Sequence, residues 1–144
     1  MSKERSLEVR VFPHMPEKSR ALRVLVVEDE FLIRWSIAET LAHDGHAVLE
    51  AGDGASAIRA LTEPAEPIDA VLLDLRLPDS NDLTLLADVR RLAPASAVIM
   101  MTAHGSLEME RGAIGLGAYR VMNKPFEMDE MRTLLSEACS LQSE

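Results

Sequence analysis

A chain of 144 residues with a single cysteine is long enough for one globular domain and excludes a fold held together by intrachain disulfides. Its formal net charge of −9 argues against binding nucleic acid through the phosphate backbone. No apolar run approaches the roughly 20 residues of a membrane span, and the N-terminus lacks the hydrophobic region of a signal peptide. We therefore expect a cytoplasmic protein without direct contact to nucleic acid or membrane.

Residues 1–20 carry mixed charges and little apolar surface, and we expect a flexible tail there, followed by one folded domain at residues 21–142. Within that domain, apolar runs alternate five times with helical patterns. The apolar runs predict strands at 23–27, 47–49, 70–74, 97–101 and 119–122. The helical patterns predict helices at 31–43, 54–61, 82–92, 106–116 and 127–141.

Five strands that alternate with five helices indicate an α/β fold in which helices cover both faces of a parallel sheet. Right-handed crossovers leave few ways to wind such a sheet. The first, third and fourth strands have the continuous apolar runs of central strands. We therefore predict a flavodoxin-like, doubly wound sheet of five strands in the order 2-1-3-4-5.

Polar side chains follow four of these strands. Glu28 and Asp29 come after the first strand, Asp74 ends the third, Thr102 follows the fourth and Lys124 follows the fifth. Each of them alone has a structural explanation as a helix cap, a turn residue or a solvated charge. Because the carboxyl ends of the strands in a doubly wound sheet converge on one crevice, we expect all five side chains to lie together.

The chemistry of this set points to phosphoryl transfer. Neighbouring carboxylates can hold Mg²⁺, which prefers oxygen ligands. A lysine offers a compact cation to a phosphoryl oxygen, and a threonine hydroxyl can donate a further hydrogen bond. An aspartate can act as the nucleophile that forms an acyl phosphate, in a reaction where positioning and charge neutralisation do most of the catalysis.

Four segments together resemble the receiver domain of two-component response regulators, of the chemotaxis-regulator type, over residues 23–141. The segments are Val26-Val-Glu-Asp-Glu30, Leu72-Leu-Asp-Leu-Arg-Leu-Pro78, Met100-Met-Thr-Ala103 and Asn123-Lys-Pro-Phe126. Two further stretches, Arg34-Trp-Ser36 and Thr102-Ala-His-Gly105, are similar to the receivers of enhancer-binding transcription activators.

The resemblance implies that Asp74 accepts a phosphoryl group from a sensor histidine kinase in a Mg²⁺-dependent reaction. It implies four protein ligands for the metal: Asp29 directly, Glu28 mainly through water, Asp74 itself and the main-chain carbonyl of Arg76. It assigns no separate enzymatic activity to the chain beyond self-phosphorylation and self-dephosphorylation.

The resemblance also implies a switch. Lys124 would pair with the phosphoryl group, Thr102 would move toward it, and the peptide between Lys124 and Pro125 would often be cis. The family usually has an aromatic residue three positions before the lysine, where this chain has Val121. We therefore expect phosphorylation here without the usual coupling of threonine and aromatic ring.

The switched surface in the family is the face formed by the fourth helix, the fifth strand and the fifth helix. Gly112 and Gly115 each cost roughly 1 kcal/mol relative to alanine in a helix interior, so we expect the fourth helix to be mobile before phosphorylation. This face would regulate a partner protein or form a homodimer. Asp82 stands where the family commonly has glycine, and we expect a left-handed turn there or at Asn81.

Three alternatives remain open. The sequence contains no output domain, so the chain is either a stand-alone regulator or a receiver that belongs to a longer protein with an output domain. A phosphatase or mutase of the haloacid-dehalogenase type also uses an aspartate nucleophile, but it needs an acid two residues later, where this chain has Arg76. A flavin-binding module needs a phosphate-cradling loop after the first strand, and that loop is acidic here.

Overall fold

The computed structural model describes residues 20–63 and 66–142, so the expected tail lies outside the described residues except for residue 20. The strands are β1 (Arg23–Val27), β2 (Ala47–Ala51), β3 (Ala70–Asp74), β4 (Ala97–Thr102) and β5 (Arg120–Asn123). The helices are α3 (Phe31–His43), α4 (Gly54–Thr62), α5 (Thr84–Leu92), α6 (Leu107–Gly115) and α7 (Met128–Gln142). Among these described helices, none is long and apolar enough to cross a membrane.

The five strands form one parallel sheet in the order β2-β1-β3-β4-β5, as the sequence predicts. The register aligns the carboxyl ends of the central strands. Val27 of β1 pairs with Leu73 of β3, and Asp74 pairs with Met101 of β4. Thr102 in turn pairs with Asn123 at the end of β5. The residues that follow these strands therefore emerge at one edge of the sheet.

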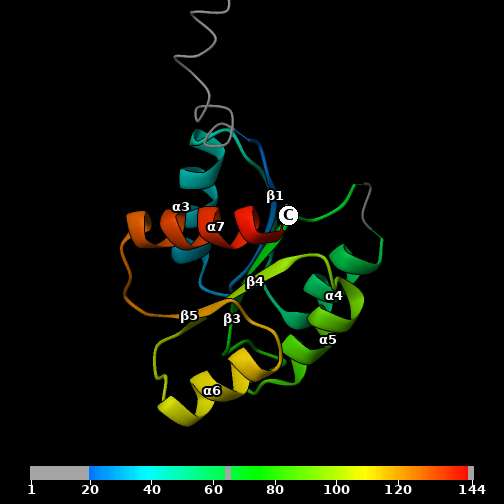
Figure 1. The fold of residues 1–144 in the computed structure, drawn as a ribbon, viewed down its shortest axis with the longest axis vertical. Helices are drawn as coiled ribbons and strands as arrows, with labels where there is room; N and C mark the ends of the chain where they lie inside the picture. Colours follow the sequence, from blue (N-terminus) through cyan, green and yellow to red (C-terminus); the bar gives the residue numbers. More distant parts are fainter. Residues whose placement is uncertain (1–19, 64–65, 143–144) are drawn as a thin grey trace, which may run out of the picture.

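Helices cover both faces of the sheet (Figure 1). Helices α3 and α7 pack on one face around a core that includes Val26, Leu72 and Met101. Helices α4, α5 and α6 pack on the other face around a core that includes Leu73 and Met100. Because both faces are covered, the apolar side chains of β3 and β4 are buried throughout, whereas the edge strands β2 and β5 keep exposed positions.

The structure confirms the predicted end of α3 and the predicted start of α4. Gly45 has φ +95°, and the amide of the next residue, His46, donates to the carbonyl of Leu41 at 3.0 Å, which ends α3 with a left-handed glycine. Asp53 opens α4, because its carboxylate accepts from the amide of Ser56 at 2.8 Å.

The start of α5 and the turn before it differ from the prediction. Helix α5 begins at Thr84, two residues later than expected, and Asp82 accepts from the Thr84 amide at 2.9 Å just ahead of the helix. The expected left-handed turn at Asp82 or Asn81 is wrong, since no non-glycine residue in the described part of the chain has a positive φ. The loop instead reverses earlier, through an antiparallel bridge between Leu77 and Ser80.

Helix α6 contains both glycines that the sequence marks. A Cβ atom at Gly112 would lie 3.0 Å from Cδ1 of Leu83, so this glycine allows α6 to approach the segment before α5 closely. A Cβ atom at Gly115 would meet nothing within 4 Å. The first glycine thus has a packing role and the second does not. The mobility of the helix remains a prediction.

Candidate functional site

Main-chain hydrogen bonds continue the sheet beyond the strand ends and place the residues of the site. The amide of Leu75 donates to the carbonyl of Met101 at 2.9 Å. The amide of Lys124 donates to the carbonyl of Thr102 at 2.7 Å. Leu75 and Lys124, the first residues after β3 and β5, are therefore fixed to β4 through their main-chain atoms.

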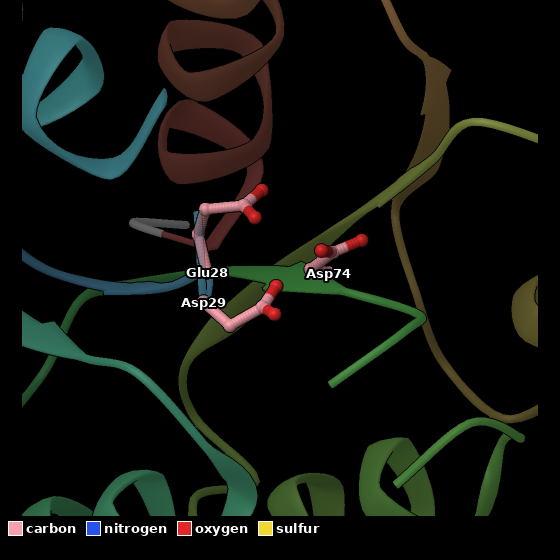
Figure 2. A group of neighbouring side chains, drawn as sticks. All are labelled: Glu28, Asp29 and Asp74. Carbon is pink, nitrogen blue, oxygen red and sulfur yellow. The ribbon is translucent and has the colours of Figure 1, made fainter. Parts of the chain in front are cut away.

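Three carboxylates meet at the ends of β1 and β3. Glu28, Asp29 and Asp74 each offer one oxygen, and these oxygens all lie within 4.8 Å of one another. Figure 2 shows their side chains projecting into a shared space from the two neighbouring strands. Glu28 is fully buried, Asp74 is 5% exposed, and Asp29 is exposed at the rim of the cluster. The sequence therefore predicts this grouping correctly.

Lys124 neutralises part of this negative charge. Its Nζ atom donates to Oε1 of Glu28 at 2.6 Å and to Oδ2 of Asp74 at 3.1 Å. Burial raises the pKa of Glu28 above its usual value, although the hydrogen bond from Lys124 opposes that rise. Burial alone would lower the pKa of Lys124, but its hydrogen bonds to both carboxylates outweigh that effect and raise the pKa. The Lys124–Pro125 peptide is cis, as the resemblance implies.

Thr102 lies at the end of β4 with its side chain buried. Its hydroxyl oxygen accepts a hydrogen bond from the amide of His104 at 3.2 Å, so it is engaged by the loop that follows β4. Val121, at the position of the family's aromatic residue, is half-buried and packs against the core under α4, α5 and α6. The nearby Tyr119 donates to Glu137 on α7 at 3.1 Å and packs on the opposite core.

Arg76 is exposed, and its amide donates to Oδ1 of Asp74 at 3.4 Å. The loop that holds Arg76 therefore bends around the Asp74 carboxylate. The metal-binding role of the Arg76 carbonyl is a prediction that these contacts leave open.

Sequence reasoning missed one residue that supports the site. Arg34 of α3 donates through Nη1 to the main-chain carbonyl of Glu28 at 2.9 Å and through Nε to Glu50 of β2 at 3.0 Å. It thereby holds the turn between β1 and α3. The sequence marks Arg34 only as part of a stretch similar to other receivers, because its partners are a backbone atom and a residue 16 positions away.

The donor set fits a hard divalent cation. Carboxylate oxygens are the ligands that Mg²⁺ prefers, and several carboxylates within 4.8 Å of one another repel each other unless a cation lies between them. Lys124 offsets part of this repulsion with a single positive charge. Glu28, Asp29 and Asp74 are therefore the residues that would hold Mg²⁺.

Comparisons with known proteins agree with this geometry. The family model described as "Response regulator receiver domain" matches residues 24–136. A putative NtrX-like response regulator of Rickettsia conorii is 36% identical over 122 residues, which cover 83% of this chain and 25% of that protein. The chain thus spans about a quarter of the length of this relative.

Two further comparisons involve proteins of similar size. Sporulation initiation phosphotransferase F of Bacillus subtilis is 31% identical over 121 residues, covering 84% of this chain and 96% of that protein. The crystal structure of a CheY-like receiver domain protein from Methanospirillum hungatei superposes with a TM-score of 0.80 at 26% identity, covering 86% of this chain and 98% of that one.

Proposed function

Because the chain belongs to the receiver domain family of two-component response regulators, we propose that its Asp74 accepts a phosphoryl group from a sensor histidine kinase. The observation that carries this proposal is the meeting of Asp74 with two further carboxylates and Lys124 at the carboxyl edge of the sheet. The family assignment favours the receiver over the phosphatase and flavin-binding alternatives. We infer that residues 21–142 act as one receiver unit and that it works in the cytoplasm.

The proposed step is a transfer between a phosphohistidine and Asp74. A carboxylate oxygen of Asp74 attacks the phosphorus atom, a P–O bond forms as the P–N bond breaks, and the imidazole leaves with the electron pair. Lys124 already lies 3.1 Å from Asp74 and is placed to contact a phosphoryl oxygen. The buried Thr102 hydroxyl would exchange its bond from the His104 amide for one to the phosphoryl group. Bound Mg²⁺ would supply neutralisation of the phosphoryl charge.

The same site supports only self-phosphorylation from a small donor and self-dephosphorylation by water, and we propose no further enzymatic activity. In dephosphorylation, water attacks phosphorus and the Asp74 carboxylate is the leaving group. Asp29 is the carboxylate of the cluster that is exposed, so water and the phosphoryl donor would enter past it.

We propose that the phosphoryl group is read out at the face formed by α6, β5 and α7. The outer surface of α6 and the turn after it expose three large apolar side chains, Leu107, Ile114 and Leu116, at 62%, 42% and 42%. Exposed apolar side chains of this kind are typical of a protein-binding surface, which could bind an output domain, a partner protein or a second copy of the chain. Val121 lacks the ring of an aromatic switch residue, so its movement would change this face less.

The test is incubation of the chain with Mg²⁺ and acetyl phosphate, followed by intact-mass measurement. We expect one added phosphoryl group in the natural sequence and none in Asp74→Asn. Asp53→Asn is a matched control, because Asp53 only caps α4 and its replacement should leave the adduct intact. An adduct that persists in Asp74→Asn, or that never forms in the natural sequence, would overturn the proposal.

A further inference from the structure

The loop after β3, residues 75–83, is fastened to a helix that lies far from it in sequence. Oδ1 of Asp79 accepts from the amide of Gly54 at 2.8 Å, and Oδ2 accepts from the amide of Ala55 at 3.0 Å. Both amides belong to the first turn of α4, where backbone N–H groups have no partner within the helix. One carboxylate therefore joins the loop after β3 to α4, and its two partners precede Asp79 by 25 and 24 positions.

Gly54 leaves little room for a side chain beside the Asp79 carboxylate. A Cβ atom at Gly54 would lie 3.1 Å from Oδ1 of Asp79 and 3.2 Å from Cδ2 of Leu85, and both approaches are tighter than ordinary contacts. A side chain at this position would require the Asp79 carboxylate or the Leu85 side chain to shift. The close approach of the loop to α4 thus depends on a glycine as well as on the aspartate.

The part of the loop next to the site is also held by hydrogen bonds. A displacement of the main chain at Asp79 would therefore be passed along this short segment to Arg76. Leu77 is buried in the core and exchanges main-chain hydrogen bonds with Ser80 at 2.7 and 3.2 Å. Arg76, next to it, donates its amide to Asp74. Five peptide bonds separate Asp74 from Asp79, and three of the four residues between them make such hydrogen bonds: Leu75 to Met101, Arg76 to Asp74 and Leu77 to Ser80.

We propose that Asp79 is a positioning residue that sets the affinity of the site for Mg²⁺ by holding the Arg76 main chain beside Asp74. This inference rests on the proposed function, in which the Arg76 carbonyl is a metal ligand. Asp79 is not among the three clustered carboxylates, so it would act through the loop. Residues that orient metal ligands in this way typically change metal affinity by about tenfold or more when they are replaced.

A purely structural role makes a different prediction. If Asp79 only caps α4, its loss would lower the melting temperature and leave Mg²⁺ affinity unchanged. Asp82 provides the matched control, because it lies in the same loop, carries the same charge and bonds only locally, to the amide of Thr84 at 2.9 Å. Asp82→Ala therefore removes the same charge and a hydrogen bond to the first residue of α5 without releasing the loop from α4.

The experiment measures Mg²⁺ affinity by isothermal titration calorimetry in the natural sequence, Asp79→Ala and Asp82→Ala. We expect about tenfold weaker binding in Asp79→Ala and a change within about twofold in Asp82→Ala. At saturating Mg²⁺, phosphorylation of Asp79→Ala by acetyl phosphate should recover, because the nucleophile is intact. Equal Mg²⁺ affinities in Asp79→Ala and Asp82→Ala would overturn the inference.

Gly54→Ala approaches the same contact from the helix side without altering any charge. It should weaken Mg²⁺ binding in the same direction, and amide exchange at positions 54 and 55 should speed up in Asp79→Ala. Unchanged Mg²⁺ affinity in Gly54→Ala, with those amides exposed to exchange, would also contradict the inference. Failure of the natural sequence itself to bind Mg²⁺ or to phosphorylate would instead overturn the proposed function, so the two failures are distinguishable.

Discussion

The Nζ atom of Lys124 lies 2.6 Å from Oε1 of Glu28, closer than the 3.1 Å that separate it from Oδ2 of Asp74. Glu28 is fully buried, so it has no solvent to stabilise its charge and depends on Lys124 for a counter-ion. The lysine therefore has a structural task in this arrangement as well as the proposed one toward a phosphoryl group.

Replacement of Lys124 should destabilise the protein through Glu28. Lys124→Met leaves the buried Glu28 carboxylate without its counter-ion and with only the Glu30 amide donating to it, which typically costs about 3 kcal/mol of unfolding free energy. The double variant Glu28→Gln with Lys124→Met should recover a large part of that loss, because position 28 then carries no charge and only the Asp74 carboxylate still lacks its lysine. Urea unfolding without divalent cations measures Lys124→Met, the single variant Glu28→Gln and the double variant. Strictly additive losses would show that Glu28 does not depend on Lys124.

Mg²⁺ should stabilise the fold through the three carboxylates. At a free concentration of about 100 times Kd, a ligand that binds only the folded state adds about 2.7 kcal/mol. We expect Asp29→Asn to raise the melting temperature in the absence of Mg²⁺, because repulsion falls, and to abolish most of the increase on adding Mg²⁺. Asp88→Asn, an exposed carboxylate on α5, should keep the full response in the same thermal scan.

The protein should become less stable as the pH is lowered, because of His46. Its Nδ1 atom accepts from the amide of Leu22 at 3.0 Å, which requires an unprotonated nitrogen. Burial lowers the pKa of His46 below its usual 6.5, although Asp44 and Asp69 act in the opposite direction. An unfolded chain then binds the proton more readily, so this stabilisation is complete above pH 6.5 and is lost as the pH falls below it.

The measurement for His46 is urea unfolding at about pH 7 and about pH 5. His46→Asn keeps an acceptor but cannot titrate, so it should lose less stability over this range than the natural sequence. His43→Asn removes an exposed histidine from the end of α3, three positions before His46, and should behave like the natural sequence. The same pH dependence in His46→Asn and the natural sequence would exclude His46 as its source.

The two glycines of α6 should respond differently to alanine. Gly115→Ala meets nothing within 4 Å and should stabilise the protein by about 0.4–1 kcal/mol, with slower amide exchange in α6. Gly112→Ala gains the same helix propensity but requires Leu83 to move, so its benefit should be smaller or reversed. Hydrogen exchange also tests the expected mobility of α6, and uniform protection across α5, α6 and α7 would contradict it.

The sheet and the acidic cluster could be predicted because their signals are local. A continuous apolar run such as residues 70–73 marks a strand covered on both faces, and its last residue, Asp74, marks the edge where such strands end together. The family resemblance then predicted features that residue spacing alone cannot predict, such as the cis peptide bond before Pro125.

The features that sequence reasoning missed depend on contacts between distant residues. Asp79 follows a proline and reads as an ordinary turn residue, and only the folded chain brings it to the amides of α4. The left-handed turn expected near Asp82 failed for a related reason. The bridge between Leu77 and Ser80 reverses the loop earlier, so no glycine is needed there.

The backbone bonds from Leu75 to Met101 and from Lys124 to Thr102 have a practical consequence for protein engineering. They anchor the chain beside the site through main-chain atoms, which survive any replacement of a side chain other than one by proline. These two bonds can therefore stay in place when a reactive side chain is exchanged, even where the exchange lowers stability, as we expect for Lys124. Substitutions at this edge of the sheet are therefore a suitable way to change the lifetime of the phosphoryl group or the preferred phosphoryl donor without redesigning the fold.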